Sequence, residues 1–240
     1  MRFFNDKLLS ALRVDSEVFK QLEAAIVVSG AREDLDEQAR NIGKAQGLKT
    51  EVISLSKVII HGLRHLTADR GANYKNAMLG AWKELLEIRI ARDKREEFIA
   101  DAGQELAEAL ICETAAEFIF LGNNEEYVCP GDYNIETRFW LAGLLDSITE
   151  MSKLVNHRLR DLKKDKAARE EVRARYLEFA ESAYNILAGF SGVPSTTIDA
   201  SRRRGQGFQS KLARVGNHLE LKANESVLLE DMALVAGGAK

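Results

Sequence analysis

Apolar residues recur at helical spacing along almost the whole chain, and they rarely alternate as they would in strands. The clearest case runs from Glu33 to Leu66, where apolar side chains follow one another about every 3.4 residues, which predicts one long helix. Helices are predicted over residues 5–29, 33–66, 74–92, 95–121, 135–155 and 172–190, and from 202 onward. Six or seven helices with short connections indicate an all-α bundle.

Two of these helices carry acidic residues among their apolar positions. In the helix over 95–121, Glu105 falls inside the apolar stripe and Glu108 projects from the neighbouring turn, so the two side chains can converge. In the next helix, Asp146 and Glu150 interrupt an almost wholly apolar circumference and share one face because they are four residues apart. The sequence therefore predicts two pairs of carboxylates at the core.

Several ionised carboxylates placed together in a core repel one another, so either some are protonated or a cation lies among them. No Lys, Arg or His occurs between Ala100 and Arg138, which favours a divalent metal as the partner. Oxygen ligands suit Mg²⁺, or Mn²⁺, better than Zn²⁺. The alternative is a purely structural role, since acidic pairs at this spacing are common on solvated helix faces.

Another acidic pair is formed by Glu84 and Glu87. The basic residues that follow it favour a solvated, salt-bridged helix face. The same basic group is also a candidate for contacts with the phosphates of RNA; it consists of Arg89, Arg92, Lys94 and Arg95.

With 240 residues and 45% hydrophobic content, the chain can bury one large core. Residues 1–30 are interpreted as an N-terminal helical extension and residues 31–236 as a single domain. The net charge of −3 gives no global attraction to nucleic acid or to an anionic membrane. Two cysteines are too few for a disulfide framework, which fits the cytoplasm, and no apolar run approaches the length of about 20 residues that spans a membrane.

The order of these features resembles the translin family and, within it, translin-associated factor X more than translin itself. The segments that carry the resemblance are Gln104–Ala109 (QELAEA), Gly143–Met151 (GLLDSITEM), the long helix Ala39–Thr67 and the stretch Tyr176–Phe190. The resemblance covers about residues 33–225 and implies a translin-like helical bundle.

The resemblance implies a metal-dependent endoribonuclease that cuts single-stranded RNA inside a hollow octamer. Its four acidic positions are filled here by Glu105, Glu108, Asp146 and Glu150, which would bind Mg²⁺ or Mn²⁺ and act as catalytic residues. Glu150 is interpreted as either a ligand or the general base. A homo-oligomer follows if the chain builds the assembly alone. The His and Arg cluster of translin is replaced here by Lys94-Arg95-Glu96-Glu97-Phe98, although nearby basic residues keep some positive charge.

Two other readings remain open. All-helical nucleoside triphosphate pyrophosphohydrolases also use an ExxE pair and further acids around Mg²⁺, but their second pair is usually ExxD, whereas this chain has DxxxE. The third reading is a non-catalytic, translin-type protein that binds RNA or DNA and in which the acids are structural. The three readings differ in whether RNA, free nucleotides or neither is hydrolysed.

Overall fold

The computed structural model describes residue 24 and residues 31–65, 68–123, 129–193 and 207–221. The predicted helix over 5–29 and Arg202, where the last helix was predicted to begin, lie outside the described residues. So do most of the predicted extension 1–30 and the end of the predicted domain, residues 222–236. Within the described residues all regular structure is helical, which confirms the predicted all-α class.

The long helices are α3 (Ala31–Gly62), α4 (Ala68–Glu87), α5 (Arg92–Ala116), α6 (Thr137–Asp161) and α7 (Lys166–Ala188), and a further helix covers residues 208–221. Three short helical turns connect or extend them: η1 (Leu63–His65), η2 (Glu117–Leu121) and η3 (Pro130–Tyr133). The predicted bundle of six or seven helices is therefore confirmed in the part of the chain that the structure covers.

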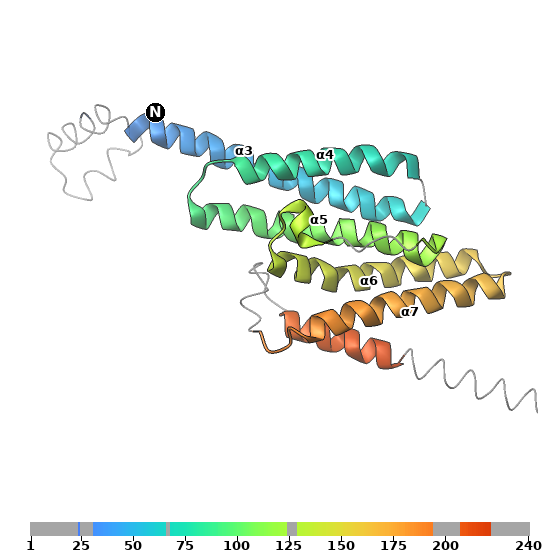
Figure 1. Cartoon of the computed structure of the whole chain (residues 1–240). Coiled ribbons are helices and arrows are strands. Elements are labelled where there is room, and N and C mark those ends of the chain that lie inside the picture. Colours follow the sequence, from blue (N-terminus) through green and yellow to red (C-terminus); the bar gives the residue numbers. More distant parts are fainter. Residues whose placement is uncertain (1–23, 25–30, 66–67, 124–128, 194–206, 222–240) are drawn as a thin grey trace, which may run out of the picture.

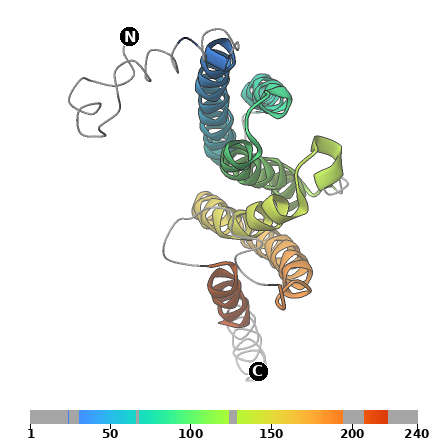
Figure 2. The ribbon, with the colours of Figure 1, turned by 90° about the vertical axis from the view of Figure 1, so that its left-hand side faces the viewer.

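Helix α5 lies at the centre of the bundle, with α3 packed on one side and α6 on the other (Figure 1). Helix α4 packs against α3, and α7 packs against α6. The helix over 208–221 lies on the side of α6 and α7 that faces away from α3 and α4 (Figure 2). Because α5 has neighbours on two sides, its buried surface is wider than the single stripe that a surface helix would show.

Helix α4 differs from the prediction at both ends. The helix was predicted over 74–92, but it begins at Ala68 and ends at Glu87. A glycine inside a helix, such as Gly71, costs only about 1 kcal/mol. Burial of Met78, Trp82 and other side chains of α4 exceeds that cost.

The contact between α5 and α6 depends on the missing side chain of Gly143. A Cβ atom there would lie 2.7 Å from the Cβ of Ala107 and 2.8 Å from the backbone nitrogen of Glu108. The second of these neighbours is backbone, which cannot move aside as a flexible side chain can. Gly143 thus allows α6 to approach α5 beside two of the four predicted acids, Glu108 and Asp146.

We expect Gly143→Ala to destabilise the protein by about 1–3 kcal/mol, because the added methyl group pushes α5 and α6 apart. Gly80→Ala is the matched control, since a Cβ at this exposed position of α4 meets no atom within 4 Å. That variant should be unchanged or more stable by up to about 1 kcal/mol. Urea unfolding of wild type and both variants measures the change in the free energy of unfolding. If Gly143→Ala were as stable as Gly80→Ala, the close approach of α5 and α6 would be contradicted.

Among the described residues, no helix combines the length and the apolar character needed to cross a lipid bilayer.

Candidate metal centre

The four acids that the sequence singled out line one cavity of about 760 Å³. Glu105 and Glu108 reach it from α5, and Asp146 and Glu150 reach it from α6. The spacing within each helix places each pair on one face, and the close packing of α5 on α6 at Gly143 brings the two faces together. Four carboxylates therefore share one site.

Glu108 is the most deeply buried of the four, with a relative exposure of 9%. Burial, followed by the negative charges of Asp146, Glu105 and Glu150, raises its pKa from 4.5 to about 8, while Lys211 opposes the shift. Without a cation the Glu108 carboxyl group is therefore mostly protonated at neutral pH. We expected Glu105 to be the buried member of this pair, but Glu105 is only half-buried. The difference arises because α3 and α6 cover α5 from two sides.

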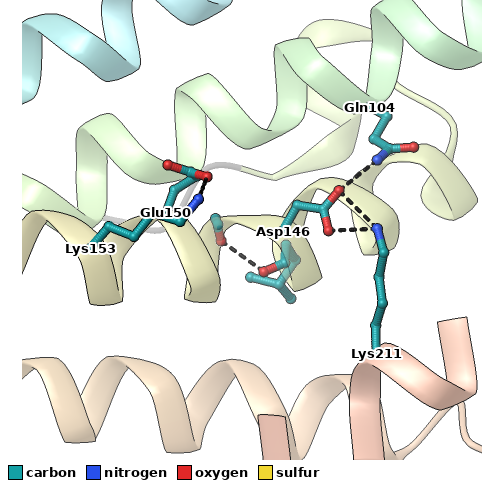
Figure 3. Close-up of polar contacts among 7 residues, drawn as sticks. Gln104, Asp146, Glu150, Lys153 and Lys211 are labelled. Carbon is teal, nitrogen blue, oxygen red and sulfur yellow. Dashed lines mark hydrogen bonds and ion pairs between the residues drawn. The ribbon is translucent and has the colours of Figure 1, made fainter. Parts of the chain in front are cut away.

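Asp146 is held by two side chains from other helices (Figure 3). Lys211 Nζ lies 2.8 Å from Oδ1 and 3.3 Å from Oδ2, and Gln104 Nε2 donates a hydrogen bond to Oδ2 over 2.8 Å. Lys211 belongs to the helix over 208–221 and Gln104 to α5. Both oxygens of Asp146 therefore already accept charge-assisted hydrogen bonds.

Glu150 forms an ion pair with Lys153, one turn further along α6 (Figure 3). The ammonium group of Lys153 is largely exposed, so water screens this pair more than it screens the contact of Lys211 with Asp146. Further basic or imidazole side chains line the cavity beside apolar ones; they are Lys57, His61, Arg64, Arg214 and His218. These five side chains form a basic wall next to the acidic centre, and the rest of the lining is mostly apolar.

The sequence pattern did not reveal these basic partners. The absence of Lys, Arg and His between Ala100 and Arg138 is a statement about one stretch of chain, whereas Lys211 is 65 residues from Asp146 in the sequence and arrives on another helix. The only available signal was the spacing of Lys211, Arg214 and His218, which places the three on one helix face.

The basic group predicted to contact RNA lies elsewhere. None of Arg89, Arg92, Lys94 and Arg95 lines the cavity. The Arg95 guanidinium donates to the carbonyl of Leu86 over 2.6 Å, and Lys94 pairs with Glu97 at 3.4 Å. Arg95 precedes Glu105 by ten residues, about 15 Å along a helix. The assignment of this group to RNA binding stays a prediction.

The donor set of the cavity fits a hard divalent cation such as Mg²⁺ or Mn²⁺, since all four acids offer oxygen ligands. The raised pKa of Glu108 agrees with this fit: burial is its main cause, and the negative charges of Asp146, Glu105 and Glu150, which a cation would offset, add to it. Among the described residues, however, no three His, Cys, Asp or Glu side chains are gathered tightly enough to hold one ion as they stand. Side-chain rotations and release of the lysine contacts would therefore accompany metal binding.

No protein-family model matches the chain, and no curated protein sequence matches it either. Among solved structures, it is similar to AfC3PO in complex with duplex RNA, with 18% sequence identity and a TM-score of 0.65, over 86% of this chain and 98% of that one. AfC3PO alone gives 18% identity and a TM-score of 0.63 over the same shares of the two chains. The structure of apo-NeC3PO gives 17% identity and a TM-score of 0.51, over 80% of this chain and 91% of that one.

These neighbours are translin-family proteins, and the alignment extends over nearly their whole length. At such low identity the similarity bears on the fold and not on the chemistry of the cavity. The chain therefore has the translin-type fold that its sequence predicted.

Proposed function

We propose that the protein is a Mg²⁺-dependent endoribonuclease whose active site is the acidic cavity between α5 and α6. The observation that carries this proposal is the burial of Glu108 among three further carboxylates, in a cavity that several cationic side chains also line. A purely structural cluster gains nothing from four acids held together, since each raises the pKa of Glu108. A metal site needs such a cluster of carboxylates, and the cationic side chains of the cavity suit the phosphates of RNA.

In this proposal Glu105, Glu108 and Asp146 hold the metal, and Glu150 acts as a further ligand or as the general base. Mn²⁺ would fit the same ligands. When bound, a divalent ion polarises a phosphodiester and lowers the pKa of a coordinated water molecule. Glu108 must first release the proton from its carboxyl group. On the basic wall, Arg64 and other cationic side chains would neutralise the phosphates of the backbone and orient the strand.

The proposed substrate is single-stranded RNA, as the resemblance to translin-associated factor X implies. One structural neighbour, AfC3PO, was solved with duplex RNA, so duplex cleavage is an alternative that the experiment must include. We further propose that the chain works as a homo-oligomer, up to the octamer that the resemblance implies.

The experiment is cleavage of end-labelled RNA by the purified protein in Mg²⁺ and in EDTA. Single-stranded RNA, duplex RNA and free nucleoside triphosphates are tested in parallel. The proposal expects internal cuts in single-stranded RNA that require Mg²⁺. Release of pyrophosphate from free nucleotides would show instead that the protein is a pyrophosphohydrolase. The absence of any hydrolysis would overturn the endoribonuclease proposal.

One observation favours a second candidate, a binding protein without catalysis. Lys211 and Lys153 already neutralise Asp146 and Glu150, as in a structural ion-pair network. This candidate expects RNA to bind equally well in Mg²⁺ and in EDTA, with no cleavage in either.

Arg89 and Arg92 are both exposed, and we propose that they contact RNA phosphates outside the cavity. The double variant Arg89→Ala/Arg92→Ala should weaken RNA binding similarly for all sequences, because phosphate contacts carry no sequence information. The slope of log affinity against log salt concentration should fall by about 1 to 2, as fewer counterions are released. Binding titrations at several salt concentrations measure this slope. An unchanged slope would show that Arg89 and Arg92 do not contact RNA.

A further inference from the structure

The contact between Lys211 and Asp146 connects two elements that lie far apart in the sequence. Lys211 extends from the helix over 208–221 to the acidic centre on α6 (Figure 3). Its Nζ atom lies 2.8 Å from Oδ1 and 3.3 Å from Oδ2 of Asp146. The side chains are 37% and 26% exposed, so both ends of the pair are partly shielded from water. The ammonium group therefore lies within the acidic centre, where its charge also lowers the pKa of Glu108.

The same carboxylate is one of the proposed metal ligands, which creates a conflict. A Mg²⁺ ion binds a carboxylate oxygen at about 2.0–2.1 Å. If Lys211 kept its position, the ion and the ammonium group would share one carboxylate at short range and repel each other. Oδ2 offers no easy alternative, because it accepts hydrogen bonds from both Gln104 and Lys211. Metal binding at Asp146 therefore requires Lys211 to leave.

We propose that Lys211 is a resident cation that competes with the divalent metal for Asp146 and so sets the metal concentration at which the site fills. The proposal rests on the metal site of the proposed function. In the metal-free protein, Lys211 offsets the charge of the acid cluster and holds the helix over 208–221 against α6. When metal is present, the ammonium group is released into the cavity.

The released ammonium group has no acid beside it on its own helix face, and the other acids of the cavity, Glu105, Glu108 and Glu150, are those assigned to the metal. Arg214 and His218, three and seven residues further on, line the cavity beside it, and Lys57 and Arg64 line it from α3 and η1. A released Lys211 ammonium group would therefore pair with an anion that enters the cavity. Under the proposed function, that anion is a phosphate of the bound RNA strand. An RNA strand that holds Lys211 should therefore favour metal binding, and metal should favour RNA binding by the same factor.

The test compares the Mg²⁺ concentration that gives half-maximal thermal stabilisation of wild type, Lys211→Met and Lys211→Arg. Lys57→Met is the control, because it removes a positive charge from the same cavity wall without removing the ion pair on Asp146. We expect the midpoint of Lys211→Met to fall about three- to tenfold, as for a partly shielded ion pair. Lys211→Arg should stay close to wild type, and Lys57→Met should change by less than about twofold.

A non-cleavable RNA strand provides the second readout. It should lower the Mg²⁺ midpoint of wild type and have a smaller effect on Lys211→Met. A midpoint of Lys211→Met equal to or above that of wild type would overturn the inference and leave Lys211 a structural ion pair, while the metal site itself stands. If Mg²⁺ stabilises none of the four proteins, the proposed metal site fails and the inference fails with it. Circular dichroism of each metal-free variant verifies that it is folded.

Discussion

The metal-free protein should lose about 3–4 kcal/mol of stability as the pH rises from 5 to 8, and Glu108→Gln should remove most of that loss. The reason is the pKa of Glu108, which is raised from 4.5 to about 8 in the folded protein. Between these two values the folded state keeps a proton that the unfolded state has released. Stability therefore falls as the pH rises through this window, and the penalty is complete above pH 8.

Urea unfolding in EDTA at several pH values measures this effect, with protein concentration held constant because an oligomer would otherwise complicate the comparison. Glu84→Gln is the matched control. Its side chain is exposed on α4 and pairs with Lys44, so it should follow the wild-type pH dependence. Mg²⁺ added at pH 8 should restore the stability that the wild-type protein has lost, but it should have no such effect on Glu108→Gln. Parallel curves for wild type and Glu108→Gln from pH 5 to 8 would show that Glu108 titrates normally.

Cleavage of RNA should fall by about 10²- to 10³-fold in both Glu108→Gln and Asp146→Asn, because each substitution removes a charged ligand from the proposed metal site while keeping its shape. RNA binding should change little, since the cationic side chains that would contact phosphates are untouched. Initial rates of cleavage in saturating Mg²⁺ measure the first effect, and binding titrations in EDTA measure the second.

The oligomeric state of each variant must match wild type, so that the loss can be assigned to chemistry rather than assembly. Glu84→Gln again serves as the control and should cleave within about twofold of wild type. It belongs to another ExxE pair, Glu84 and Glu87, which lies on a solvated face as predicted. If Glu108→Gln retained wild-type cleavage, the cavity would not be the catalytic site.

The fold was largely predictable because the bundle follows from one repeated local signal. A helix of twenty or more residues carries several turns of the same apolar spacing, so α3, α5, α6 and α7 were all located, although the end of α6 and the start of α7 were each misplaced by six residues. The start of α4 was misplaced because Gly71 and its neighbours have the composition of a turn. Helix propensity is a weak signal that packing overrides, and packing is not visible in the sequence.

The candidate site was predictable only in part. The acids share helix faces, and face sharing is a local property that residue spacing reveals. That Glu108 rather than Glu105 is the buried acid depends on which sides of α5 its neighbours cover. The pairing of Lys211 with Asp146 depends on how the helix over 208–221 packs beside α6. Neither of these two facts is encoded in the spacing of residues along one helix.

The most direct test of the account is a calorimetric titration of Mg²⁺ into the wild-type protein at pH 7, in two buffers with different heats of ionisation. If the acid cluster binds the metal through Glu108, binding should release about one proton per protein chain, because Glu108 must ionise to become a ligand. Glu108→Gln should bind Mg²⁺ more weakly and release no proton at this site. Absence of Mg²⁺ binding to wild type, or equal binding by Glu108→Gln, would contradict a metal centre between α5 and α6.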